Sequence, residues 1–167
     1  MKHLTLLRHA KSAWDDALLP DHERPLAPRG AKACRQLATW IEDARLRPQL
    51  VVCSTAARAR QTLEPLLGPL GVPEVSYENG LYHASARWLA DRVAALDPAV
   101  DDVMFVGHNP GLQDLALLFS SASAARDRIA AKLPTGALVR LELEGGWEAF
   151  APGSVEIAVL IEPRELR

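Results

Sequence analysis

Short runs of apolar residues alternate along the chain with longer segments in which apolar residues recur every three or four positions. The runs have the length of strands and are rich in β-branched residues; they cover residues 4–7, 50–53, 75–77, 103–106, 137–141 and 155–161. Most of them lack the polar alternation of a sheet that has one solvated face. They therefore predict strands buried on both faces, as in a parallel or mixed sheet.

The segments between these runs have the spacing of amphipathic helices. In the first of them, Cys34, Leu37 and Ile41 fall on one helix face, and a second helix is expected around residues 63–70. Pro65 bends or interrupts that second helix, because proline lacks the amide hydrogen that an internal helical position donates.

Further apolar segments predict helices around residues 88–96 and 112–119, whereas the small residues at 120–125 indicate a loop or a frayed helix end. Alternating strands and helices followed by two late strands predict an α/β fold. We expect a three-layer α/β/α sandwich with a central, mostly parallel sheet. No linker, repeat or low-complexity tract divides the chain, so residues 1–167 are interpreted as one domain.

The composition is that of an ordinary globular protein. Of the 167 residues, 49% are hydrophobic and 24% are charged, and the formal net charge is -2. A slightly acidic chain has no overall attraction to nucleic acid or to anionic membranes, so neither is expected as a partner. Two cysteines exclude a disulfide framework, and no apolar stretch reaches the ~18–20 residues that span a bilayer. We therefore expect a cytoplasmic protein.

Basic side chains follow three of the predicted strands. Arg8 and His9 come directly after the first strand, Arg58 lies just beyond the second, and His108 follows the fourth. Ligands of open parallel sheets bind beyond the carboxyl ends of the strands, so these side chains are expected to share one crevice. Two of the three clusters also begin helices, whose N-terminal amides and dipole attract anions.

Two arginines and two histidines together favour the binding of a phosphate group. The guanidinium fork matches phosphate oxygens, and a neutral imidazole can attack phosphorus to form a phosphohistidine. The histidines show no clustering that would suit a metal ion, and the chain has no Gly-x-x-x-x-Gly-Lys loop for nucleotide triphosphates. We expect neither a metal nor another cofactor.

The same residues resemble the motifs of the histidine phosphatase superfamily, which has the phosphoglycerate-mutase-like fold. Residues 7–10, Leu-Arg-His-Ala, resemble its signature, with Ala10 where glycine is commoner. Residues 54–62 resemble its second motif, residues 107–108 its third, and residues 21–30 the stretch that leads into its first helix. This ordered set covers most of the chain and is most similar to the SixA-type phosphohistidine phosphatases.

The resemblance implies a role for each site residue. His9 is the expected nucleophile, and Arg8, Arg58 and His108 are expected to act in catalysis and to bind the phosphate. Ser12 is expected to add a hydroxyl contact to the substrate. The implied reaction is hydrolysis of protein phosphohistidine through a phosphorylated His9. The implied partner is a phosphorylated His-containing phosphotransfer domain or a phosphocarrier protein, and a monomer is favoured.

The chain departs from larger members of the superfamily at residues 79–84, where their proton-donating acid usually lies. This segment, Asn-Gly-Leu-Tyr-His-Ala, has no carboxylate. An alkoxide leaving group needs a proton from a positioned acid, whereas imidazole, with a pKa of ~6.5, leaves readily. The missing acid therefore favours phosphohistidine over phosphate esters, with His83 as an alternative donor. A broad small-molecule phosphomonoesterase, a non-catalytic phosphate-binding domain and a mutase remain as alternatives.

Overall fold

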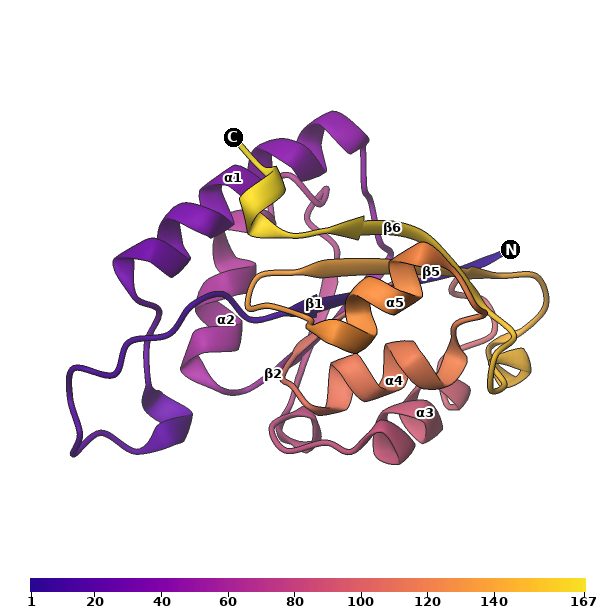
Figure 1. Ribbon diagram of the computed structural model, residues 1–167, viewed down its shortest axis with the longest axis horizontal. Coiled ribbons are helices and arrows are strands. Elements are labelled where there is room, and N and C mark those ends of the chain that lie inside the picture. The colour runs from indigo at the N-terminus through magenta and orange to yellow at the C-terminus, as the bar shows by residue number, and fades with distance from the viewer.

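The computed structural model describes residues 1–167 and contains one six-stranded sheet (Figure 1). The strands are β1 (Lys2–Arg8), β2 (Leu50–Ser54), β3 (Glu74–Glu78), β4 (Asp102–Gly107), β5 (Leu138–Leu143) and β6 (Glu156–Ile161). Each overlaps one of the apolar runs that predicted it. Their order across the sheet is β3-β2-β4-β1-β5-β6.

All strands except β5 run in the same direction. β1 is parallel to β4, and β2 is parallel to both β3 and β4, whereas β5 is antiparallel to its neighbours β1 and β6. The expected central, mostly parallel sheet is therefore confirmed. Parallel neighbours need long crossover connections, and helices supply them between the first four strands.

Helices cover both faces of the sheet. They are α1 (Pro28–Ala44), α2 (Ala57–Leu63), α3 (Ala86–Ala94), α4 (Gly111–Phe119) and α5 (Ala124–Ala131). In Figure 1, α1 and α2 lie on one side of the sheet and α3, α4 and α5 on the other. None of them combines the length and the apolar content that crossing a membrane requires.

Each helical layer encloses its own core against the sheet. Leu37 of α1 and Leu63 of α2 pack in a cluster with Met104 on one face, whereas Leu115 of α4 packs in a larger cluster with Phe105 on the opposite face. Successive residues of β4 thus point to opposite cores, which is why that strand is apolar at every buried position. The expected three-layer α/β/α sandwich is confirmed.

Two helices differ from the expectation. The second helix, expected around residues 63–70, lies earlier, because α2 ends at Leu63. Beyond it the chain forms a 3₁₀ turn at Glu64–Leu66, so Pro65 interrupts the regular helix as predicted. The helix α5 was missed because Ile129 is its one buried residue, and so it has no repeating apolar stripe.

The strand register brings three strand ends to one place. Arg8 at the end of β1 is paired with Gly107 at the end of β4, and Val106 of β4 is paired with Cys53 of β2. β1 runs toward the left of Figure 1, where the loop that connects it to α1 projects from the body of the molecule. The residues that follow β1, β2 and β4 therefore meet at this edge of the sheet.

Candidate active site

The two histidines singled out by the sequence lie side by side at this edge. The amide of His9 donates a hydrogen bond to the carbonyl oxygen of Gly107 at 3.0 Å, which extends the β1–β4 pairing by one residue. The ring centroids of His9 and His108 are consequently 5.2 Å apart. The parallel register alone explains this proximity, because each histidine directly follows one member of the last residue pair.

The imidazole of His9 has a defined tautomer. Its Nδ1 lies 2.7 Å from the carbonyl oxygen of Ala10. A carbonyl oxygen only accepts hydrogen bonds, so in the neutral ring Nδ1 carries the proton and Nε2 keeps its lone pair. Burial lowers the pKa of His9 to about 4, and the positive charges of Arg58 and Arg8 act in the same direction. At neutral pH the ring is therefore uncharged, and its Nε2 is available as a nucleophile.

His108 is likewise held in the neutral form. Its Nε2 shares a hydrogen bond of 2.8 Å with the hydroxyl of Ser54 at the end of β2, and this hydroxyl also accepts from the amide of Ala56. Burial lowers the pKa of His108 to about 3, with further contributions from His9 and Arg58. A neutral imidazole in this position can offer a hydrogen bond to a phosphate oxygen without a permanent charge.

Arg58 is the basic residue that the second motif contributes. It lies in the first turn of α2 and is only 6% exposed, whereas Arg60 is exposed. Its Nη1 donates to the carbonyl oxygen of Asp21 at 2.8 Å, and its Nη2 donates to the Asp21 carboxylate at 3.1 Å. Burial therefore distinguishes Arg58, the expected site residue, from its neighbour Arg60.

Arg8, the last residue of β1, directly precedes His9 and is half-buried. Its Nη1 donates to the carbonyl oxygen of Leu133 at 2.9 Å, and burial lowers the pKa of its guanidinium, assisted by the charge of Arg58. The side-chain nitrogen Nδ2 of Asn109, the residue after His108, donates to the same carbonyl oxygen at 3.0 Å. The segment around Leu133 thus ties together the chain after β1 and the chain after β4. Asn109 was not among the expected site residues.

Ser12 is buried, but its hydroxyl already has a partner. The Ser12 Oγ accepts a hydrogen bond from Nη1 of Arg24, and Ser12 also forms an isolated β-bridge with Leu26. The bridge folds the loop back on itself and places Arg24 close enough to His9 for its charge to act on that ring. Arg24, itself only 7% exposed, is thus a second buried arginine at the site beside Arg58.

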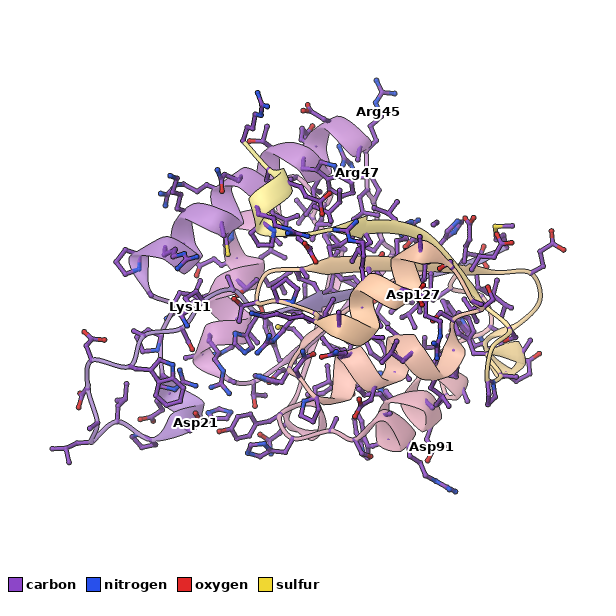
Figure 2. All side chains as sticks on the ribbon, in the orientation of Figure 1. Lys11, Asp21, Arg45, Arg47, Asp91 and Asp127 are labelled. Carbon is purple, nitrogen blue, oxygen red and sulfur yellow. The ribbon has the colours of Figure 1, made fainter.

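The Asp21 carboxylate links these arginines. It accepts hydrogen bonds from Arg24, from Arg58 and from the hydroxyl of Tyr82. The hydrogen bond from Tyr82, followed by the hydrogen bond from Arg24 and the positive charges of Arg58 and Arg24, holds the pKa of Asp21 well below its usual range. Figure 2 shows Asp21 on the loop that projects from the sheet edge. This carboxylate stays ionised and is therefore not a proton donor at neutral pH.

The ring of Tyr82 packs against three histidines at the site. The ring of Tyr82 makes an edge contact with His108 at a centroid distance of 5.5 Å, and it also contacts His22 and His83 at 4.7 Å and 4.0 Å. His83, the alternative proton donor, is exposed at the rim beside this ring. Nothing in the sequence singled out Tyr82, because a lone tyrosine after a weak strand carries no motif.

Most of the unpaired buried polar atoms of the protein collect here. Four buried side-chain nitrogen or oxygen atoms have no hydrogen-bond partner, and three of them are Arg8 Nε, Arg58 Nε and His108 Nδ1. Buried polar atoms are normally paired, and exceptions concentrate at functional sites. The three belong to the residues that the sequence assigned to phosphate binding.

Comparison with known proteins identifies the family. Residues 4–86 match the family model of the histidine phosphatase superfamily, branch 1. The uncharacterized protein Rv1276c of Mycobacterium tuberculosis is 34% identical to this chain over 163 residues, which cover 95% of this chain and 100% of that protein. The resemblance is thus not confined to the motifs.

Two solved structures are similar over nearly the whole chain. The putative phosphohistidine phosphatase SixA from Nakamurella multipartitia has a TM-score of 0.83 and 28% identity, covering 97% of this chain and 96% of that one. The putative phosphohistidine phosphatase SixA from Agrobacterium tumefaciens has a TM-score of 0.83 and 27% identity, covering 97% and 99%. With its motifs placed at one sheet edge of this fold, the chain belongs to the histidine phosphatase superfamily and is a phosphatase.

Proposed function

We propose that the protein hydrolyses N-phosphohistidine on other proteins, through a phosphorylated His9 and without a metal ion. The observation that carries this proposal is the set of groups around His9. A neutral imidazole with a free Nε2 lies among Arg8, Arg24 and Arg58, and Asp21, the carboxylate in contact with Arg24 and Arg58, is held ionised. Such a site attracts a phosphoryl group but offers a poor proton donor to its leaving group.

The reaction proceeds in two displacements at phosphorus. In the first, His9 Nε2 attacks, a new N–P bond forms on His9, and the N–P bond of the substrate breaks. The released imidazole takes up a proton from solvent, which its basicity allows without a dedicated acid. In the second, a water oxygen attacks the phosphorus, the N–P bond to His9 breaks, and inorganic phosphate leaves. The arginines and His108 stabilise the charge on the phosphoryl oxygens in both steps.

The substrate in this proposal is a protein, such as a phosphorylated His-containing phosphotransfer domain or a phosphocarrier, and the reaction takes place in the cytoplasm with the enzyme as a monomer. Its support is the similarity to the two SixA-named structures and the position of His9 directly after the carboxyl end of β1. Ser12 acts on the substrate through Arg24, which its hydroxyl anchors.

The test compares two peptides of one sequence, carrying either phosphohistidine or phosphoserine at the same position. We expect kcat/KM to be at least about tenfold higher for phosphohistidine, because only the serine alkoxide needs a positioned acid. A rapid acid-free quench should trap phosphate on His9. The His9→Ala variant, checked for native circular dichroism, should form no phosphoenzyme.

The alternatives predict other outcomes. Equal turnover of both peptides and of small phosphate esters would identify a broad phosphomonoesterase. Absence of a phosphoenzyme with every donor would identify a non-catalytic phosphate-binding domain. Phosphate trapped on a residue other than His9 would reassign the nucleophile.

A further inference from the structure

A groove of about 530 Å³ lies beside the candidate active site and shares Arg8 with it. Five basic side chains line it: Arg8, Lys11, Arg29, Lys132 and Arg164. They come from the end of β1 and the residues after it, from the first turn of α1, from the residue after α5, and from the C-terminal turn at Pro163–Glu165. In Figure 2, Lys11 lies next to α1 at this end of the sheet.

Most of this positive charge is not neutralised within the protein. Lys11, Arg29 and Lys132 form no ion pair and donate no side-chain hydrogen bond, and all three are exposed. The carboxylate of the groove, Glu162, is already engaged by Arg164 at 2.6 Å and by Arg128 at 3.3 Å. The chain as a whole has a formal net charge of -2, so this cluster of unpaired basic side chains is opposite in sign to the protein's net charge. A concave surface of one sign attracts ligands of the opposite sign.

The groove is continuous with the active site. Arg8 lines the groove, and its chain neighbour His9 faces His108. The loop after Lys132 closes against the residues after β1, because the amide of Gly136 donates to the carbonyl oxygens of Arg8 and His9 at 3.1 Å and 2.9 Å. An anion in the groove and a phosphoryl group at His9 can therefore belong to the same substrate molecule.

The lining indicates what kind of anion fits. Small-molecule pockets are mostly walled by apolar and aromatic side chains that enclose the ligand. Here the apolar lining consists of the small side chains of Ala33, Pro134 and Pro163, and the cationic side chains of Lys11, Arg29 and Lys132 are exposed. Such a surface offers electrostatic attraction and little enclosure, which suits an acidic segment on the surface of a protein.

We propose that the groove binds acidic side chains that flank the phosphohistidine in the protein substrate, and so selects phosphohistidines that lie in acidic surroundings. This rests on the proposed function, since it takes the substrate to be a phosphohistidine protein. It adds a specificity determinant, formed mainly by Arg29, Lys132 and Lys11, that takes no part in the chemistry at His9.

The test uses phosphohistidine peptides that differ only in carrying glutamate or glutamine on both sides of the phosphohistidine. The variants are Arg29→Gln/Lys132→Gln in the groove and Arg45→Gln/Arg47→Gln as the control with the same loss of charge. Arg45 and Arg47 lie at the other end of α1 from Lys11 in Figure 2. Values of kcat/KM are measured at low and at high ionic strength.

We expect the wild-type protein and the control variant to prefer the glutamate peptide by about tenfold at low salt, as for a few partly screened charge pairs. In the groove variant this preference should fall below about threefold, while kcat/KM for the glutamine peptide stays within about twofold of wild type. The preference should also shrink at high salt, because exposed charges are screened. Equal kcat/KM values for both peptides in the wild-type protein would overturn the proposal.

Failure of the proposed function would look different, since the phosphohistidine peptides would then be hydrolysed no faster than phosphoserine peptides or not at all. The groove is tested in that case by fluorescence anisotropy with labelled glutamate and glutamine peptides that carry no phosphate. Binding of the glutamate peptide that is weakened in the groove variant and not in the control supports an acidic-segment site. If inorganic tripolyphosphate binds through Arg29 and Lys132 while the glutamate peptide does not, the ligand is a small polyanion and the proposal is wrong.

Discussion

Asp21 accepts hydrogen bonds from both terminal nitrogens of the Arg58 guanidinium: Nη2 lies 3.1 Å from Oδ2 of Asp21, and Nη1 lies 2.8 Å from the backbone oxygen of Asp21. Asp21 therefore has two opposed effects on a phosphoryl group at His9. By fixing the position of Arg58, Asp21 helps that guanidinium stabilise the transition state. The negative charge of Asp21, in contrast, lies near the dianionic phosphoryl group and weakens its binding.

Replacing Asp21 by Asn separates these two effects. The amide removes the negative charge and has one acceptor oxygen, whereas the carboxylate uses two, Oδ2 for Arg58 and Tyr82 and Oδ1 for Arg24. We expect kcat for a phosphohistidine peptide to fall about tenfold, because Arg58 keeps its hydrogen bond to the backbone oxygen of residue 21 but loses the ion pair that fixes its Nη2. The inhibition constant of inorganic phosphate should stay within about threefold of wild type or become tighter. Steady-state kinetics with phosphate as a product inhibitor measure both, and an unchanged kcat would show that Arg58 needs no help from Asp21.

The role of Arg58 itself is tested by Arg58→Ala. Loss of one charge stabiliser of the transition state typically lowers the rate by about 10²–10³, and we expect kcat/KM to fall in this range. The matched control is Arg60→Ala, since Arg60 lies two residues away and is exposed. Its kcat/KM should remain within about twofold of wild type. A loss of less than tenfold in Arg58→Ala would place its guanidinium outside the phosphate-binding site.

The buried histidines predict how stability depends on pH. The pKa of His9 is about 4 in the folded protein and near 6.5 when the chain is unfolded. Between these values the unfolded chain binds more protons than the folded one, so the free energy of unfolding falls as the pH falls from 6.5 toward 4. At pH 5 this costs roughly 2 kcal/mol for His9 relative to pH 7.

The measurement is urea unfolding at pH 7 and pH 5 for wild type and for His9→Asn, whose side-chain amide can still donate to the Ala10 carbonyl. The variant should lose about 2 kcal/mol less than wild type between the two pH values, because groups common to both proteins cancel. Activity follows the same ionisation: kcat/KM should persist down to about pH 5 and decline near pH 4, where His9 takes up a proton. Equal pH dependence of stability in the two proteins would contradict a neutral His9.

The positions of His9 and His108 were predictable because each directly follows a buried strand, and the ends of neighbouring parallel strands share one sheet edge. The contacts of Asp21 and Ser12 were not predictable in this way. Asp21 meets Tyr82 across 61 residues of sequence, and Ser12 meets Arg24 because the loop closes through a bridge between Ser12 and Leu26. Hydrophobic periodicity locates regular elements, but it contains no information on how an irregular loop folds back.

The first helix and the loop that carries His9 touch backbone to backbone at Gly30. A Cβ atom at this position would lie 2.1 Å from the carbonyl oxygen of Lys11, which also accepts a hydrogen bond from the amide of Ala27. Gly30→Ala should therefore displace the loop between Ala10 and Ser12, although alanine by itself favours a helix. We expect it to lower the free energy of unfolding by about 1–3 kcal/mol, as overpacking does, and to lower kcat because His9 moves with the loop.

The matched control is Gly68→Ala, since nothing lies within 4 Å of a Cβ at Gly68. This change should leave kcat unaltered and alter the free energy of unfolding by less than about 1 kcal/mol. Urea unfolding and kinetics on the same phosphohistidine peptide measure both effects. If Gly30→Ala has wild-type stability and wild-type kcat, then the close contact with Lys11 relaxes at no cost, and the packing of α1 does not determine where His9 lies.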